Sequence, residues 1–171
     1  MIAYLRSMRA TRSDQILAAT ARTLRAEGVR IAGVIQLNSY SEPFHRRLMD
    51  LECLDSGRIR RISRDTFGHE DQRRIDAQML KGIADCLHAT VADSDPQLVI
   101  LNRFGHQEAR GEGLSPVFAQ ALDRKIPLVT SLAPPLAEAF RTALGEAVTE
   151  LDDDLETVLD WARSATARRA A

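Results

Sequence analysis

The chain has 171 residues, of which 44% are hydrophobic and 27% charged, which is typical of a globular domain with its own core. Its 23 Lys and Arg residues nearly balance 24 Asp and Glu residues, so no bulk positive charge points to nucleic acid or an anionic membrane surface as a partner. No apolar run reaches the length of a membrane span or a signal peptide, and we expect no membrane insertion. Cys53 and Cys86 lack motif spacing, which favours free thiols in a cytoplasmic protein.

The first half of the chain alternates apolar runs with a segment of helical period. Ile2–Leu5 is predicted to be a strand, and apolar residues then recur every three or four positions between Ser13 and Gly28, which indicates a helix. Arg30–Leu37 is predicted to be a second strand, and residues 38–47 a turn-rich connection. A hairpin is expected next, because an Asp-Ser-Gly turn separates its two strands, Leu48–Leu54 and Arg58–Ser63.

After a polar loop at residues 64–73, the second half alternates helices and strands. Ile75, Met79, Ile83, Leu87 and Val91 recur every four residues and predict an inward-facing helical stripe. The remaining predicted elements are the strand Gln97–Leu101, a helix capped by Ser115 and packed through Val117, Ala121 and Leu122, the strand Ile126–Leu132, a helix carrying Leu136, Phe140, Leu144 and Val148, and a last helix, opened by Asp152–Asp154, with Leu155, Val158, Leu159 and Ala162.

This order of elements predicts an α/β domain of three layers, with a mostly parallel sheet, helices on both faces and an antiparallel hairpin insertion. We expect a single domain over residues 1–166 and a frayed tail at residues 167–171. In such folds ligands bind outside the carboxyl ends of the strands. The segment from Asn102 onwards is expected to lie at such an end.

Polar residues and glycines follow the buried run at Leu98–Leu101 and suggest a ligand-binding loop. Arg103 offers a fork of donors, Asn102 can donate and accept, and the glycines of the loop allow the backbone to approach a ligand closely. The candidate ligand-binding residues are Asn102, Arg103, Gly105, His106, Glu108 and Gly111 of the loop, with Gln36, Asn38 and Thr130 at neighbouring strand ends. A structural alternative stays open, in which Asn102 caps the turn, Phe104 fills the core and Glu108 pairs with Arg103 or Arg110.

Three stretches, RAEGVRIAGVIQ, MDLECLDSGRIRRIS and LVILNRFGHQEARGEGL, resemble the bacterial family known as domain of unknown function 2478. The resemblance runs from the first strand to about Leu144, and its most specific part is the Asn-x-Phe-Gly-x-x-Glu-x-x-Gly segment that begins at Asn102. It implies a setting near molybdate-transport and nitrogenase functions. The family in turn resembles, more weakly, the small nucleoside-triphosphatases of the P-loop class, which have a hairpin at the place of Met49–Ser63.

The chemistry of a P-loop is degenerate in this sequence. A P-loop needs glycines to wrap the phosphates, a lysine to reach them and a hydroxyl to hold Mg²⁺, yet no glycine precedes Gly28 and no lysine precedes Lys81. Counting back from Gly28, Ser13 falls in the place of the lysine and Asp14 in that of the hydroxyl. Asn102, which carries no charge, stands where the family pattern has the strand-end Asp that serves Mg²⁺.

Together these observations predict a protein that binds a small anion or a nucleotide without competent phosphate-loop motifs, in which Asp14 joins the ligand-binding set and no catalytic residue is assigned. No metal site is expected, because no His or Cys residues have ligand spacing, and no cofactor is assigned. One alternative is a protein–protein adaptor for a transporter or a metalloenzyme assembly factor, with the arginine-flanked hairpin as its contact. Another is a weak nucleoside-triphosphatase. A protein partner or a homo-oligomer stays open.

Overall fold

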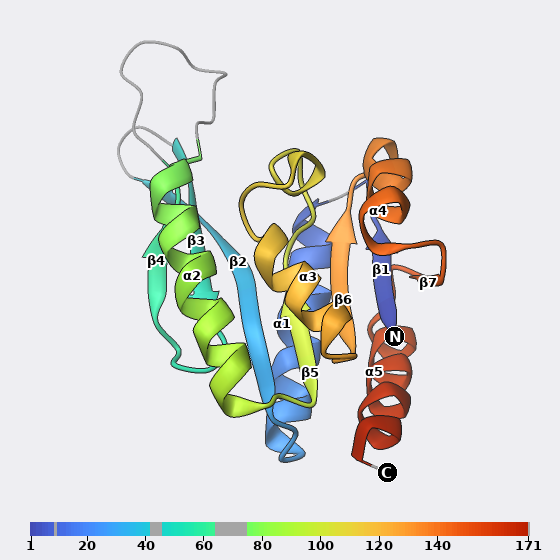
Figure 1. Cartoon of the computed structure of the whole chain (residues 1–171). Helices are drawn as coiled ribbons and strands as arrows, with labels where there is room; N and C mark the ends of the chain where they lie inside the picture. Colours follow the sequence, from blue (N-terminus) through green and yellow to red (C-terminus); the bar gives the residue numbers. More distant parts are fainter. Residues whose placement is uncertain (9, 42–45, 64–74, 171) are drawn as a thin grey trace.

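A seven-stranded sheet forms the middle layer of the computed structural model, which describes residues 1–8, 10–41, 46–63 and 75–170 (Figure 1). The strands are β1 Ile2–Arg6, β2 Ile31–Ser41, β3 Arg46–Cys53, β4 Ile59–Arg61, β5 Leu98–Leu101, β6 Leu128–Leu132 and β7 Val148–Leu151. Their order is β4-β3-β2-β5-β6-β1-β7, with parallel pairing from β2 to β7 and antiparallel pairing of β2 with β3 and of β3 with β4. The predicted mostly parallel sheet with an antiparallel hairpin is therefore confirmed.

Helices cover both faces of this sheet. They are α1 Ala10–Ala26, α2 Ala77–Ser94, α3 Ser115–Asp123, α4 Ala137–Leu144 and α5 Leu155–Ala170. Helices α2, α3 and α4 pack on the face towards the viewer in Figure 1 and share one apolar core, whereas α1 and α5 pack on the far face around a second core. The sheet divides the two cores because alternate residues of each strand point to opposite faces. The expected three layers are confirmed.

Strand β2 is longer than the sequence pattern predicts. It continues through Asn38 to Ser41 and pairs with β3, so much of the segment 38–47 is strand rather than the expected connection. Residues 42–45 of that connection, and the predicted loop at 64–73, lie outside the described residues. Polar side chains such as Gln36 and Asn38 do not interrupt β2, because the ladder with β3 satisfies its backbone groups whatever the side chains are. Both residues thus lie within β2 rather than at its end.

Helix α2 faces the sheet with a different set of residues from the one predicted. It begins at Ala77, because the carboxylate of Asp76 accepts from two amides of the first turn. Ile75 precedes the helix, and both it and Met79 are exposed, so their predicted inward packing is wrong. Leu80 takes part in the core instead, together with the correctly predicted Ile83 and Leu87. A strict four-residue spacing drifts about 40° per step around a helix with 3.6 residues per turn, so Met79 lies off the face that Ile83 and Leu87 present to the sheet.

Two predictions about α3 and one about Val148 are also wrong. Ser115 is the first residue of α3 rather than its cap, and its hydroxyl donates to the carbonyl of Glu108. Leu122 of the same helix is exposed. Val148 belongs to β7, which extends the sheet beside β1, and not to the helix before it. At the C-terminal end, α5 continues to Ala170, and fraying of residues 167–171 stays a prediction.

None of the helices in the described ranges combines the length and apolar character that a membrane crossing requires.

Candidate functional site

Asp14 forms the centre of a polar cluster at the carboxyl edge of the sheet. It lies in the second turn of α1, the helix that begins directly after β1, and is only 4% exposed. The strand β5 ends at the same edge, so the next residues, Asn102 and Arg103, are brought against α1. An ionised carboxylate at this depth requires hydrogen-bond donors or a counter-charge.

Three side chains from two different parts of the sheet donate to the Asp14 carboxylate. Asn102 Nδ2 and Arg103 Nη2 each lie 2.8 Å from Oδ1, and Asn38 Nδ2 lies 2.8 Å from Oδ2. The guanidinium of Arg103 neutralises the charge, and the two amides satisfy further lone pairs. Donors of the chain itself therefore occupy the positions around the carboxylate that a bound cation would otherwise take.

A second layer of contacts orients the two amides. Gln36 Nε2 donates to Asn38 Oδ1 at 2.9 Å, and Ser131 Oγ donates to Asn102 Oδ1 at 2.9 Å. Asn102 is 1% exposed and its backbone amide bonds to the carbonyl of Val34, so its orientation is fixed on every side. These contacts point the amide groups of Asn38 and Asn102 towards Asp14.

Arg103 has donors to spare. Its side chain is 30% exposed, and Nη2 is its only nitrogen with a partner within the described residues. The Nε donor is buried and has no acceptor in the part of the chain that the structure describes, an arrangement that costs about 1–3 kcal/mol. Arg103 does not pair with Glu108, so the structural alternative for this residue is wrong.

Glu108 organises the rest of the loop rather than the cluster. Its carboxylate is 7% exposed and accepts from the amide of Gly105 and from that of Leu114, each at 2.9 Å. Residues 105–114 are thereby folded around one buried carboxylate. Phe104, also buried, packs its ring edge-to-face against Phe118 and Phe140, as the structural alternative expected.

The predicted site residues thus separate into groups. Asp14, Gln36, Asn38, Asn102 and Arg103 form the cluster, whereas Gly105, Glu108 and Gly111 belong to the self-contained loop turn. His106 is exposed on that turn. Thr130 is fully buried in β6, and its hydroxyl donates to the carbonyl of Leu101, so it does not contact the cluster.

Sequence reasoning missed Ser131 and the segment around Asp153. Ser131 follows Thr130 directly, and period-two alternation would have placed one of the two at the cluster. Asp153, from the turn before α5, accepts from Ser7 Oγ at 3.0 Å and receives Arg12 through its carbonyl, so this turn covers the start of α1. No local pattern could reveal the contacts of Asp153, because more than 140 residues separate the partners.

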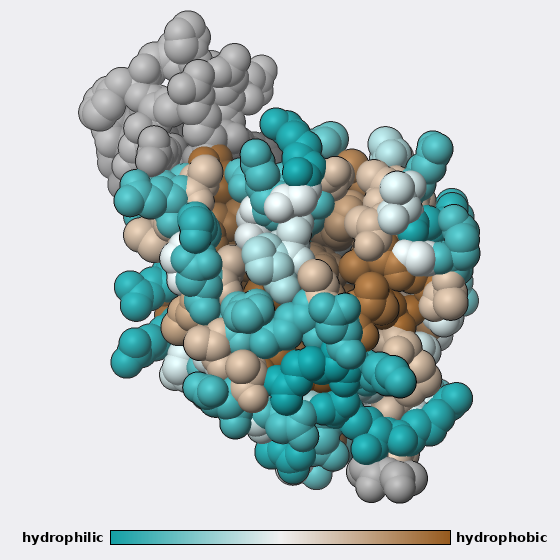
Figure 2. Space-filling model, viewed as in Figure 1, coloured by the Kyte–Doolittle hydropathy of each residue, from teal (hydrophilic) through white to brown (hydrophobic). Residues whose placement is uncertain are grey.

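The outer side of the loop borders a groove of about 690 Å³ between α3 and α4. Its lining comes from the loop, from the outward side of α3 and from α4, and includes the exposed Leu122. Figure 2 shows apolar surface gathered between these two helices on the face towards the viewer. The groove and the Asp14 cluster therefore lie on the two sides of the same loop.

Neither a metal site nor a paired thiol is present in the ranges that the structure describes. No group of three or more His, Cys, Asp or Glu side chains there could hold a metal ion. Cys53 and Cys86 are free, and burial raises the pKa of the Cys53 thiol. The Asp14 carboxylate, which could serve a cation, is already occupied by Asn38, Asn102 and Arg103.

Comparison with known proteins gives one family and one distant relative. The molybdenum import ATP-binding protein ModC 2 of Bradyrhizobium diazoefficiens is 28% identical over 155 residues, which are 91% of this chain. The chain spans only 17% of that protein. No solved structure matches the chain. The profile of the family described as protein of unknown function (DUF2478) matches residues 2–161, beyond the range that the sequence resemblance covered, and the chain therefore belongs to that family.

Proposed function

We propose that this protein binds a small oxyanion, or the phosphates of a nucleotide, at Arg103. The observation that carries the proposal is the state of the Arg103 guanidinium: Asp14 fixes it through Nη2, while Nε lacks an acceptor within the described residues and part of the side chain reaches solvent. A fixed guanidinium with unused donors suits tetrahedral or phosphate oxygens, which accept charge-assisted hydrogen bonds. Its place at the carboxyl edge of a parallel sheet is where such folds bind ligands.

The proposed binding involves no competent phosphate loop. The positions that the sequence comparison assigns to the motif contain no glycine and no lysine, and those from Ala10 to Asp14 already lie in α1. The direct contact between Asp14 and Asn102 supports the distant P-loop relationship, because the sequence comparison put these two residues in the places of the hydroxyl and the strand-end acid that share Mg²⁺. Here an amide and the Arg103 guanidinium take up the carboxylate instead.

The proposed setting is molybdenum handling in the cytoplasm. The relative that carries a homologous stretch is named a molybdenum import ATP-binding protein. Molybdate is a tetrahedral dianion and fits the donors of Arg103 as well as sulfate or phosphate does. The two free thiols favour a reducing compartment. A setting in nitrogen metabolism is supported by the family resemblance alone.

Isothermal titration with molybdate, tungstate, sulfate, phosphate, ATP and GTP tests this proposal. We expect at least one of these anions to bind, and Arg103→Ala to weaken its affinity about ten- to a hundredfold, which corresponds to losing roughly 1.5–3 kcal/mol from one charge-assisted hydrogen bond. The affinity of Arg103→Lys should lie between those of the wild type and Arg103→Ala, because lysine keeps the charge but lacks the forked donors of arginine.

Arg110→Ala is the matched control, since Arg110 is an exposed arginine of the same loop. Its affinity should equal that of the wild type. Binding that is unchanged in Arg103→Ala, or the absence of binding by every anion in the series, would contradict the proposal.

A second candidate function is an accessory module that acts on an ATP-binding transport protein. The specific observation is that 91% of this chain aligns with 17% of such a protein, so a homologous module exists within a longer chain. A module within the same chain as an ATP-binding protein stays next to it at all times, and a separate chain of the same family could bind such a protein as a partner. A purified ATP-binding transport subunit should then change its ATPase rate when this chain is added, and an unchanged rate would contradict this candidate.

A further inference from the structure

The groove between α3 and α4 carries an inference about a partner. We propose that it docks an amphipathic helix of another protein, with an apolar face towards the groove and Lys or Arg residues along its margins. The inference rests on the second candidate function, in which the chain acts on a protein partner. It does not depend on anion binding at Arg103.

The walls of the groove are more apolar than polar and include several small residues. Ala119 on α3 and Ala139 and Ala143 on α4 face each other across it, and Phe118 and Leu144 lie buried at its base. Small side chains let a third helix approach to the 8–10 Å at which helices pack. The nine residues of α3 extend for about 13 Å, which matches roughly two turns of a docked helix.

The charged side chains that line the groove are all acidic. Among its lining residues the charged ones are Glu108, Asp123 and Glu138. The Glu108 carboxylate is taken by two backbone amides, but the exposed Asp123 and Glu138 have no ion-pair partner among the described residues. An acidic margin around an apolar floor is complementary to a helix with basic flanks, and it disfavours an acidic one.

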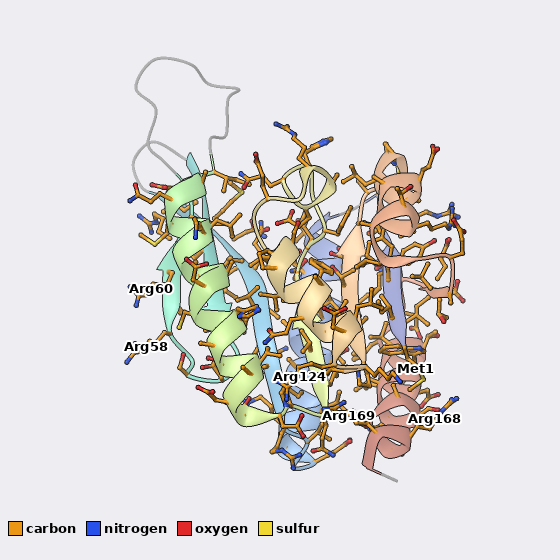
Figure 3. All side chains as sticks on the ribbon, in the orientation of Figure 1. Met1, Arg58, Arg60, Arg124, Arg168 and Arg169 are labelled. Carbon is orange, nitrogen blue, oxygen red and sulfur yellow. The ribbon has the colours of Figure 1, made fainter. Side chains whose placement is uncertain are left out.

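Other arginines of the described residues lie away from this groove. Figure 3 shows Arg58 and Arg60 at the β4 side of the sheet, and Arg124 and Arg169 near its amino edge. Arg124 and Arg169 both bond to Asp95 and to backbone carbonyls, which are structural contacts. The expectation that the arginine-flanked hairpin is the contact surface therefore gives way, in this proposal, to the groove.

Selection from a displayed library of random 20-residue helical peptides on the full chain tests the inference. Peptides that also bind the Ala143→Arg variant are removed from the library. In that variant a long, positively charged side chain replaces an exposed alanine and fills the groove beside its acidic residues. We expect the surviving peptides to carry apolar residues at i, i+3, i+4 and i+7 and a net positive charge. Fluorescence anisotropy then gives the affinity of the best peptide for each variant.

Two variants, Ala143→Arg and the double variant Asp123→Lys, Glu138→Lys, should each lower the affinity for that peptide at least about tenfold. Ala89→Arg and Asp93→Lys, matched changes at exposed positions of α2, should leave it unchanged. Three outcomes would overturn the inference: no enrichment, enrichment of peptides without basic residues, or self-association of the chain that Ala143→Arg abolishes. Anion titration of the same Ala143→Arg variant shows separately whether Arg103 still binds its ligand.

Discussion

Asp14 is the residue on which the candidate site depends, because its carboxylate is the acceptor shared by Asn38, Asn102 and Arg103. It joins α1 to the middle of β2 and to the residues that follow β5, all far from it in the sequence. A carboxylate that is 4% exposed and has three donors contributes to stability and to geometry at once. Any change at Asp14 should therefore affect folding as well as the position of Arg103.

Asp14→Ala should lower the free energy of unfolding by about 2–4 kcal/mol, because it leaves two amides and a guanidinium without their acceptor. Urea denaturation measures the change. Asp85→Ala is the control, since Asp85 forms an exposed pair with Lys81 on α2 that should contribute less than about 0.5 kcal/mol. Equal effects of the two substitutions would show that the Asp14 cluster adds nothing beyond a surface pair.

The environment of Tyr4 predicts how the free energy of unfolding depends on pH. Its hydroxyl donates to Glu150 of β7 at 2.7 Å and accepts from Arg141 of α4 at 3.1 Å. Burial, and then the neighbouring Glu150 carboxylate, raises the pKa of Tyr4 above its usual value of 10.0. Because the folded state has the higher pKa, this contribution is complete below about pH 10 and is lost as the pH rises through the folded pKa.

Urea unfolding of the wild type and of Tyr4→Phe between pH 8 and pH 11 tests this dependence. The wild type should be the more stable at pH 8, and the difference should shrink towards pH 11, because phenylalanine has no proton to lose. A difference that stays constant over this range would contradict the assigned role of the hydroxyl.

Among the elements, the loop from Asn102 to Leu114 connects the two candidate surfaces. Its first residues contact Asp14, and its later residues line the groove. Glu108 fixes its shape, and Gly113 makes room for that carboxylate: a Cβ at Gly113 would lie 2.2 Å from Glu108 Oε1, and its φ is +58°. The loop is therefore specified by one buried acid and one glycine more than by its exposed side chains.

Gly113→Ala should destabilise the fold by about 2–4 kcal/mol, the sum of a left-handed alanine and a displaced Glu108. Gly111→Ala is the matched control, because Gly111 also has a positive φ, +78°, but nothing lies within 4 Å of its Cβ position. That variant should lose only about 1–2 kcal/mol. Thermal and urea unfolding measure both, and equal losses would rule out the contact with Glu108.

The elements that the sequence predicts well are those with long, unmixed patterns. The apolar runs at β1, β5 and β6 identify central strands because both faces of such strands are covered. β7 was missed because Val148 continues the four-residue spacing of Leu136, Phe140 and Leu144, so a helical pattern runs into an edge strand. Periodicity cannot show where a helix stops when Gly145 is the only interruption.

The residues of the cluster could be predicted as a set but not as contacts. Position after β5 nominates Asn102 and Arg103, and the P-loop comparison nominates Asp14. Asn38 was nominated as a strand end, although it lies within β2. Which of them donates to which oxygen depends on pairs 24 and 88 residues apart, and on the sheet order that brings them together. The structural alternative paired Glu108 with an arginine, but its carboxylate accepts from two backbone amides of its own loop, which the loop already holds within reach.

For the whole molecule, the missing glycines and lysine of a phosphate loop and the occupied Asp14 carboxylate predict that the chain does not hydrolyse magnesium nucleotides. Phosphate release from ATP or GTP should stay at background, and 5 mM Mg²⁺ should shift the melting temperature by less than about one degree, since a cation that does not bind adds no stability. A phosphate-release assay and a thermal melt provide the measurement.

The comparison to make is between the wild type and the double variant Asp14→Ala, Asn102→Ala. Robust turnover by the wild type that disappears in the double variant would mean that the cluster holds a metal after all and that Arg103 moves aside to admit it.

The two edge strands of the sheet affect how this protein can associate with other chains. β4 is three residues long and carries Arg60 and Arg61, and β7 is four residues long and carries Glu150, which holds Arg6. Short, charged border strands discourage another chain from adding a strand. Polymerisation through backbone ladders is therefore disfavoured at both ends of the sheet, and complexes should form between side-chain surfaces, where single substitutions can separate one partner from another without unfolding the protein.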